Sequence, residues 1–339
     1  MTNTDVGGKP YQWLENWAHL PGDEHAHHGW AHHGLAVSRS GELLGFHPGE
    51  PSLLTFNLDG SVARSVPCPV REAHGLTLVV EDDVEYLWIA DNGSKPVRQA
   101  DGSYQPGHPD TAGHVIKIAL DGTVVQELPT PPLPTYEDAA YSPTSVAVDE
   151  KRHGGSGDVW VADGYGRSLV HRFTADGEYR GTISGEDGTA GAFNCPHAVF
   201  IDRRKSEPEL YIADRGNARV QVYGLDGTFR RSFGSDYLNS PRAFATLGNQ
   251  LVIAELFAQL TMVGTDDEFV GYIGANPTAQ DRPGWPNALT ADGATTQPPV
   301  QAGKFNSPHG IAIDCDGAIY VSEWLVGGRL IKLDPSAAP

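Results

Sequence analysis

The sequence is poor in cysteine and has no long apolar segment. Its three cysteines, Cys68, Cys195 and Cys315, show no CxxC spacing, which argues against a disulfide framework and against a thiolate zinc site. No apolar run approaches the roughly 18 residues that a membrane-spanning helix needs, and the first residues lack a charged segment followed by an apolar one. We therefore expect a soluble cytoplasmic protein.

Basic residues are also scarce. The chain has 24 Lys and Arg against 43 Asp and Glu, which gives a formal net charge of −19. A protein of that charge repels phosphate backbones and anionic lipid surfaces. We expect neither nucleic acid nor a membrane as a partner.

Turn-forming residues, in contrast, are abundant. The 339 residues include 40 Gly and 25 Pro, and only 39% of the chain is hydrophobic. This composition excludes a helical bundle and favours many short strands joined by tight turns, and the length suits one large all-β domain.

Six segments of the chain repeat one pattern: a short opening phrase such as His309-Gly-Ile-Ala-Ile, a strand ending in Ala-Asp or Ser-Glu, and a third strand. The opening residues are His33, His74, Thr144, His197, Arg242 and His309. Three strands plus an outer fourth, at this spacing, are typical of a propeller blade. We predict a single all-β domain, a six-bladed β-propeller of the NHL-repeat type.

The predicted boundaries follow from the repeat. Residues 1–32 supply a closing strand and a His-rich loop, residues 33–333 form the blades, and residues 334–339 are a tail. The last repeat lacks an outer strand, so we expect residues 11–17 to complete it and close the ring.

The six opening residues should form a ring near one mouth of the central channel, and four of them are histidines. His74, His197 and His309 fall on alternate blades, so their imidazoles should converge with near three-fold symmetry. Three neutral nitrogen ligands with one open position are typical of a catalytic metal site. We expect one divalent transition metal, zinc before iron(II), copper or manganese; the alternative is that these histidines only hydrogen-bond carbonyls at strand starts.

His33 is a separate candidate on an adjacent blade. It could be a fourth ligand, a catalytic proton carrier, or a simple hydrogen-bonding residue. It ends a run with five histidines between residues 25 and 33. That run either binds a metal of its own or is a mobile, solvated loop, and we retain only His33 as a site residue.

The repeats resemble those of NHL-repeat propellers, and several segments carry a narrower resemblance. The segments 142–149, 159–165, 195–197, 213–221 and 307–309 are similar to those of peptidyl-α-hydroxyglycine α-amidating lyase. That family is a six-bladed propeller with a zinc ion held by three histidines, a tyrosine near the metal and an arginine for the substrate carboxylate. The resemblance places the ligands at His74, His197 and His309, the tyrosine at Tyr165 and the arginine at Arg215.

The chain departs from the family at several of these positions. Ser307 and Gly310 replace a Met and a calcium-binding Asp, which argues against a structural calcium, and Gly166 replaces a disulfide cysteine. A further arginine of the family's first blade has no counterpart near residues 46–48. The resemblance thus covers the scaffold and the metal site, with the substrate end altered.

The first functional hypothesis is a metal-dependent lyase acting on a hydroxylated, anionic small molecule or peptide-like substrate. Tyr165 would be the acid/base, because a nearby cation makes phenolate accessible; otherwise it packs against a neighbouring blade. Arg215 would bind a carboxylate in bidentate fashion, unless it only pairs with Asp214, and Arg242 would be a second anion contact. The alternatives are a metal-dependent hydrolase or lactonase, and a non-catalytic binding propeller.

Overall fold

The structure is a computed structural model that describes residues 2–15, 17–20, 22, 24–108 and 110–335. The chain divides into two compact units. Unit 1 contains residues 1–69, 97–105 and 242–339, and unit 2 contains residues 70–96 and 106–241. The prediction of a single domain stays a prediction.

Unit 2 contains three four-stranded antiparallel sheets. Their strands are β8 (Ala73–Glu81), β9 (Val84–Asp91), β12 (His114–Ala119) and β13 (Val124–Leu128); β14 (Ser145–Val148), β15 (Val159–Asp163), β16 (Leu169–Phe173) and β17 (Tyr179–Ile183); and β18 (Pro196–Asp202), β19 (Glu209–Asp214), β20 (Arg219–Gly224) and β21 (Phe229–Phe233).

Unit 1 is built on two four-stranded sheets and one five-stranded sheet. Their strands are β4 (Ala36–Val37), β5 (Leu43–Phe46), β6 (Ser52–Phe56) and β7 (Val62–Pro67); β22 (Pro241–Leu247), β23 (Gln250–Glu255), β24 (Gln259–Val263) and β25 (Phe269–Ile273); and β28 (Pro308–Ile313), β29 (Ile319–Glu323), β31 (Arg329–Asp334), β2 (Lys9–Leu14) and β1 (Thr2–Val6).

Short elements decorate these sheets. They are the helix α1 (Glu24–His28), the paired strands β3 (Trp30–Ala31) and β30 (Leu325–Val326), the hairpins β10 (Pro96–Arg98) with β11 (Tyr104–Pro106) and β26 (Ala288–Leu289) with β27 (Thr295–Thr296), and the 3-10 turns η1 (Pro134–Tyr136), η2 (Lys151–His153), η3 (Arg215–Asn217) and η4 (Ala279–Asp281). No helix among the described residues is long and apolar enough to cross a membrane.

The six large sheets are the six predicted blades, and the predicted fold class, an all-β six-bladed propeller, is confirmed. The apolar runs of the second strands explain the packing, because these strands are covered on both faces. In unit 2, for example, Trp88 of β9, Val161 of β15 and Phe173 of β16 belong to one buried cluster between neighbouring sheets. The sheets pack face to face through such clusters.

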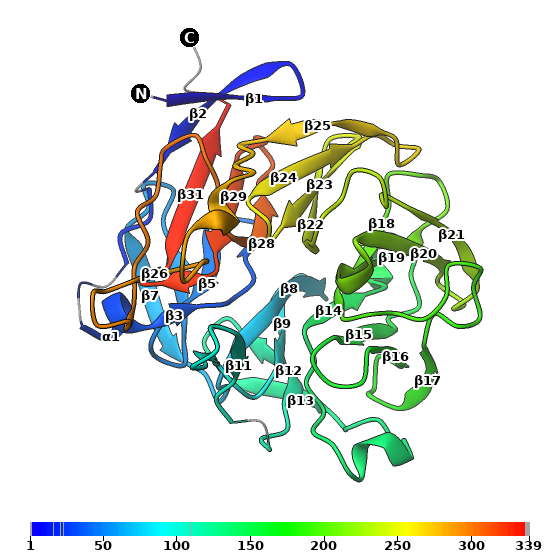
Figure 1. Ribbon diagram of the computed structural model, residues 1–339. Coiled ribbons are helices and arrows are strands. Elements are labelled where there is room, and N and C mark those ends of the chain that lie inside the picture. Colours follow the sequence, from blue (N-terminus) through cyan, green and yellow to red (C-terminus); the bar gives the residue numbers. More distant parts are fainter. Residues whose placement is uncertain (1, 16, 21, 23, 109, 336–339) are drawn as a thin grey trace. The chain divides into compact units, whose positions relative to one another are not determined.

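The N-terminal segment completes the last blade, as predicted. Strand β2 pairs with β31, with Trp13 opposite Leu333, and Figure 1 shows the two strands side by side. Trp13 is 3% exposed and its ring lies 4.7 Å from that of Phe305. The strand covers residues 9–14 rather than 11–17, and β1 adds a fifth strand that the sequence did not suggest. Residue 16 of the predicted strand and residues 336–339 of the predicted tail lie outside the described residues.

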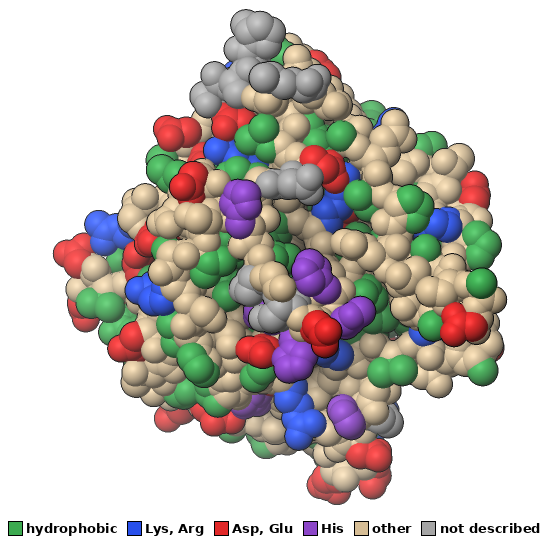
Figure 2. All heavy atoms as spheres, turned by 90° about the vertical axis from the view of Figure 1, so that its left-hand side faces the viewer, with side chains coloured by type: hydrophobic (Ala, Val, Ile, Leu, Met, Phe, Trp, Pro, Cys, Tyr) green, Lys and Arg blue, Asp and Glu red, His purple; other side chains and the backbone are tan. Residues whose placement is uncertain are grey.

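The first part of the His-rich run forms a short helix instead of a loop. His25, His27 and His28 lie in α1 and are exposed, whereas Ala26 is buried; histidine side chains (purple) stand out on the face shown in Figure 2. The chain then enters β3, which pairs with β30. That pairing carries the last two histidines of the run into the interior, where both are buried.

Candidate functional site

Each of the three predicted ligand histidines occupies a β-bulge at the start of a first strand. The pairing register shifts around His74, between Ala73 and Gly75, and in the same way around His197 and His309. A bulge places one extra residue in a strand and re-aims its side chain. All three histidines are buried. The bulges therefore change the direction of these imidazoles, which would otherwise follow the alternation of side chains between the two faces of the sheet.

The carboxylates that end the second strands hold the segments before these bulges. Asp91 accepts hydrogen bonds from the backbone N–H groups of Arg71 (2.7 Å) and Glu72 (3.0 Å). Asp214 accepts from Asn194 N–H (2.8 Å). Glu323 does the same for two residues that precede His309. The Ala-Asp and Ser-Glu endings of these three blades thus position the segments that lead into His74, His197 and His309.

Four of the predicted site residues come together in unit 2. The Tyr165 hydroxyl lies 3.2 Å from His74 Nε2 and 3.1 Å from His197 Nε2. The two imidazole rings are 4.6 Å apart between centroids. Arg215 Nη1 donates to the Tyr165 oxygen at 3.4 Å, and the guanidinium lies 5.4 Å from the centre of the tyrosine ring. Two imidazoles, a phenol and a guanidinium therefore meet around one oxygen atom.

The orientation of His74 suits a metal ligand. Its Nδ1 lies 2.6 Å from the backbone carbonyl of Thr144, and a carbonyl only accepts, so Nδ1 carries a proton and, in the neutral imidazole, Nε2 has the lone pair. A hydrogen bond of this kind fixes the tautomer of ligating histidines. The Thr144 hydroxyl in turn lies 3.2 Å from the carbonyl of Pro196, the residue before His197. Strand-start hydrogen bonds and metal ligation are thus compatible at His74.

Glycines on both sides of Tyr165 permit the turn that carries it. A Cβ at position 164 would lie 2.4 Å from the carbonyl oxygen of Pro196, and a Cβ at position 166 would lie 2.2 Å from a carboxylate oxygen of Asp163. Gly166 therefore leaves no room for the cysteine that the lyase family has at this place.

Arg215 is not neutralised by a carboxylate in the part of the chain that the structure describes. Asp214, its neighbour, pairs with Arg219 instead, at 2.7 Å. Burial opposes the charge of Arg215, but Tyr165 and Cys195 nearby hold the pKa of the guanidinium above its ordinary value. Arg215 therefore stays cationic and is available for an anionic group.

The other predicted residues lie in unit 1. His309 Nδ1 is 3.3 Å from the backbone carbonyl of His33, whose own ring lies with Nδ1 2.8 Å from the carbonyl of Gly34. The ring that contacts His309 is that of His32, at 4.5 Å between centroids. Arg242 places its guanidinium 5.4 Å from the centre of the Trp324 ring.

Sequence reasoning passed over His32, although it stands in the five-histidine run. The ring of His32 also lies 5.6 Å from that of Trp324, so it joins His309 to the aromatic residues of unit 1. The signal was the run itself, but a run of histidines does not say which of its members faces the interior.

Position 310 leaves no space for the family's calcium-binding side chain. A Cβ on Gly310 would lie 2.6 Å from Ser322 Oγ and 2.7 Å from the carbonyl of His33. Ser307, which stands where the lyase family has a Met, donates a hydrogen bond from its hydroxyl to the carbonyl of Trp324 at 2.9 Å. Backbone and hydroxyl groups thus fill the surroundings of these two positions.

Comparison with known proteins supports the same relationship. No family model matches the chain. Human NHL repeat-containing protein 3 is 29% identical over 239 residues, which cover 66% of this chain and 60% of that protein. The Caenorhabditis elegans protein named probable peptidyl-alpha-hydroxyglycine alpha-amidating lyase pgal-1 is 24% identical over 327 residues, which cover 88% of this chain and 81% of the relative.

The predicted resemblance is confirmed. This chain is similar both to NHL-repeat proteins and to amidating lyases, and it spans 60% and 56% of the human and mouse NHL relatives that it matches. Among solved structures, a streptogramin B lyase aligns with a TM-score of 0.59 at 15% identity, covering 96% of this chain and 97% of that one. A Xanthomonas campestris gluconolactonase aligns with a TM-score of 0.57 at 12% identity, covering 95% and 89%. These two likenesses show the fold.

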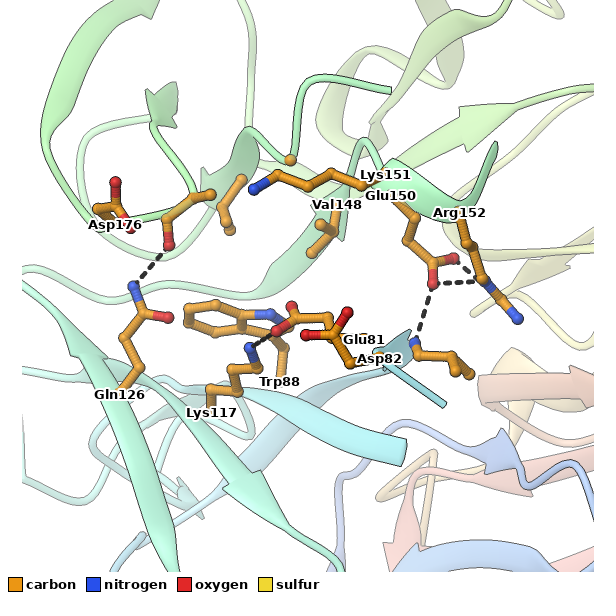
Figure 3. A pocket seen from close by; sticks show the side chains of 14 residues that line it. Glu81, Asp82, Trp88, Lys117, Gln126, Val148, Glu150, Lys151, Arg152 and Asp176 are labelled. Atoms are coloured by element: carbon orange, nitrogen blue, oxygen red, sulfur yellow. Dashed lines mark hydrogen bonds and ion pairs between the residues drawn. The ribbon is translucent and has the colours of Figure 1, made fainter. Parts of the chain in front are cut away.

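We call His74, His197, Tyr165 and Arg215 the tyrosine cluster. A cavity of about 460 Å³ in unit 2 is separate from this cluster. Glu81, at the far end of β8 from His74, lines it together with Trp88 and Lys151. Glu81 stands seven positions after His74 along β8, which corresponds to roughly 23 Å. Figure 3 shows that Glu81 is paired with Lys117 and Glu150 with Arg152 at the walls of this cavity. We assign no part of the candidate site to it.

Proposed function

We propose that the protein is a metal-dependent lyase that acts on a hydroxylated, anionic, peptide-like or small-molecule substrate. The observation that carries the proposal is the meeting of His74 Nε2 and His197 Nε2 at one atom, the Tyr165 oxygen. His309 is the third proposed ligand because it occupies the same bulge of the repeat. The confirmed similarity to amidating lyases supports the reaction class.

The residues present fit a zinc ion. The donors are neutral imidazole nitrogens, with Nδ1 of His74 held by a carbonyl so that Nε2 can ligate. When bound, the metal would act as a Lewis acid that lowers the pKa of the substrate hydroxyl. Other divalent transition metals could use the same nitrogens, but three imidazoles with an open fourth position are typical of catalytic zinc sites.

Tyr165 and Arg215 supply the remaining chemistry of the proposal. Arg215 binds the substrate carboxylate, since its guanidinium has no carboxylate partner of its own among the described residues. Tyr165, acting as a phenolate, would take the proton of the substrate hydroxyl. The carbonyl of the product then forms as the neighbouring carbon–nitrogen bond breaks, and the proton passes to the leaving nitrogen. An α-hydroxyglycine would give an amide and glyoxylate, so that atoms and charge balance.

His33 and Arg242 have secondary roles in the proposed function. The His33 ring is close to its own neighbour's carbonyl, so we keep it as a catalytic candidate only where Tyr165 proves dispensable. Arg242 is a second contact for an anionic substrate, with Trp324 beneath its guanidinium. A reducing, cytoplasmic compartment is proposed because the three cysteines do not have the number or spacing of a disulfide framework.

The first test is elemental analysis of the purified protein. We expect about one zinc ion per chain, and we expect the double variant His197→Ala, His309→Ala to lose it, because one imidazole cannot hold the metal alone. The double variant His27→Ala, His28→Ala is the control, since these exposed histidines lie in α1. Full metal content in the first variant would overturn the ligand assignment, and loss in the control would point to the histidine run.

The substrate class is tested by offering N-acyl-α-hydroxyglycines and lactones to the zinc-loaded protein. Release of glyoxylate from the hydroxyglycine is the expected result. Hydrolysis of a lactone without glyoxylate release would favour the hydrolase alternative, in which water attacks a carbonyl. A protein that holds no metal and turns over neither substrate would be a binding propeller.

A further inference from the structure

In three blades, the carboxylate that ends the second strand is paired with a basic residue of the third strand. Asp91 lies 3.2 Å from His114, Asp214 lies 2.7 Å from Arg219, and Glu323 lies 2.7 Å from Arg329. Each of these carboxylates is buried, and a buried charge is costly unless it is paired or fully hydrogen-bonded. In these three blades, the third strand therefore supplies a basic side chain beside the buried carboxylate of the second strand.

Asp163, the equivalent residue of the blade that carries Tyr165, is satisfied differently. Within the described residues it forms no ion pair. Its Oδ2 accepts a hydrogen bond from the Tyr136 hydroxyl at 2.6 Å, and the same hydroxyl lies 2.7 Å from His171 Nε2. His171 Nδ1 in turn lies 2.7 Å from the hydroxyl of Thr182. Asp163 and His171 are both fully buried.

The partners of Asp163 are neutral. Burial lowers the pKa of His171 to about 3 and, together with Asp163, raises that of Tyr136. Since Tyr136 donates to the carboxylate, it accepts from His171 Nε2–H, and His171 Nδ1 accepts from Thr182. One direction of hydrogen bonding thus runs from Thr182 through His171 and Tyr136 to Asp163.

Asp163 clamps both sides of the turn that presents Tyr165. One carboxylate oxygen accepts from Ser142 N–H at 2.8 Å, and the other accepts from Arg167 N–H at 2.6 Å. Ser142 also accepts, through its carbonyl, the N–H of Tyr165 at 3.3 Å. The carboxylate therefore fixes the segment before Thr144 and the segment after Tyr165 at the same time.

We propose that Tyr136 and His171 are positioning residues that hold the Asp163 carboxylate, and through it the Tyr165 turn, in the geometry of the site. Tyr136 comes from η1, which ends a Pro-rich segment, residues 129–136, between β13 and Thr144, so this segment contributes to the site without touching its reacting groups. The effect of these residues on turnover rests on the proposed function. Their structural link to the Tyr165 turn, through Asp163, does not.

The structural link is tested by amide hydrogen exchange on the whole protein. In Tyr136→Phe, exchange of the Arg167 and Ser142 amides should become roughly fivefold faster or more, as expected for losing one buried hydrogen bond at their acceptor. Tyr223→Phe is the matched control. Tyr223 donates to Gln221 at 3.0 Å, and Gln221 donates to Asp214 at 3.1 Å, so this variant should alter exchange at Asn194 and leave Arg167 unchanged.

The catalytic link is tested on turnover of the hydroxyglycine substrate. Tyr136→Phe should lower kcat about tenfold with KM and zinc content unchanged, because a displaced acid/base slows the chemical step alone. His171→Gln should retain more activity than His171→Ala, since the amide can donate as Gln221 does. Unchanged exchange at Arg167 and Ser142 in Tyr136→Phe would overturn the proposal, even if the wild type is an active zinc lyase. Altered exchange in a protein without zinc or turnover would instead overturn only the proposed function.

Discussion

At the scale of single residues, backbone register matters as much as residue type. His74, His197 and His309 are ordinary strand residues by sequence, but each lies at a bulge that redirects its side chain. Gly164 and Gly166 have the same kind of role, because a side chain at either place would collide with Pro196 or Asp163. The chemistry of the tyrosine cluster depends on these local departures from regular strand geometry.

The change Tyr165→Phe removes the phenol oxygen at which the two imidazoles and Arg215 meet. If Tyr165 transfers protons, kcat should fall by roughly 10²–10⁴-fold with little change in KM, as for other positioned acids and bases. Zinc content should not change, because the phenol is not a proposed ligand. Steady-state kinetics with elemental analysis measures both. An unaltered kcat in a variant that retains zinc would move the base elsewhere, with His33 as the next candidate.

Replacement of His171 should change the pH dependence of stability. Its folded-state pKa of about 3 lies below the ordinary value near 6.5. Below pH 6.5 the unfolded chain therefore binds a proton at His171 that the folded chain refuses, so stability falls as the pH drops from 6.5 towards 3. For one group this amounts to about 2 kcal/mol between pH 7 and pH 5.

Urea unfolding at the two pH values tests this expectation. His171→Gln should lose about 2 kcal/mol less than the wild type on going from pH 7 to pH 5, because glutamine does not titrate. An equal loss in both proteins would show that His171 becomes protonated in the folded state, contrary to its burial.

At the scale of elements, the chain's first strands stabilise its last blade. β2 supplies the fourth strand beside β31, and β1 covers the edge of β2. Trp13 and Tyr11 of β2 belong to a buried cluster with residues of β23, β28 and β31. Loss of β2 would leave a sheet edge and an apolar surface exposed, which favours aggregation.

Deletion of residues 1–14 should therefore destabilise the protein strongly. Loss of a buried Trp alone costs about 3–5 kcal/mol, so we expect a large fall in the melting temperature or aggregation. Deletion of residues 1–6, which removes β1 but keeps β2, is the control and should cost less, because all four β1 residues before Val6 are exposed or partly exposed and Trp13 stays in place. Equal melting temperatures for the wild type and the longer deletion would contradict the role of β2.

At the scale of the whole molecule, the repeat distributes the predicted site residues over both units. Unit 2 holds His74, His197, Tyr165 and Arg215, and unit 1 holds His33, His309 and Arg242. The net charge of −19 gives the few site arginines special weight, because each is a local cation in a molecule that repels anions overall. An anionic substrate would have to be recognised by these residues and not by the general field.

The sequence by itself determined the number of blades, the order of their strands and the histidines at the strand starts. These features follow from local periodicity, turn residues and a repeat, all of which can be read within about 50 residues of chain. The resemblance of segments 159–165 and 213–221 to those of the lyase family also pointed to Tyr165 and Arg215, which lie together in the structure.

Only the tertiary structure decided which contacts the segments outside the repeat make. It placed His32 against His309, Tyr136 against Asp163 and His171, and β1 against β2. His32 and His309 are 277 positions apart in the sequence, and Tyr136 is 27 positions from Asp163 and 35 from His171. Such contacts arise when loops and insertions, which carry no periodic pattern, are folded onto the sheets, so packing selects them and local sequence does not.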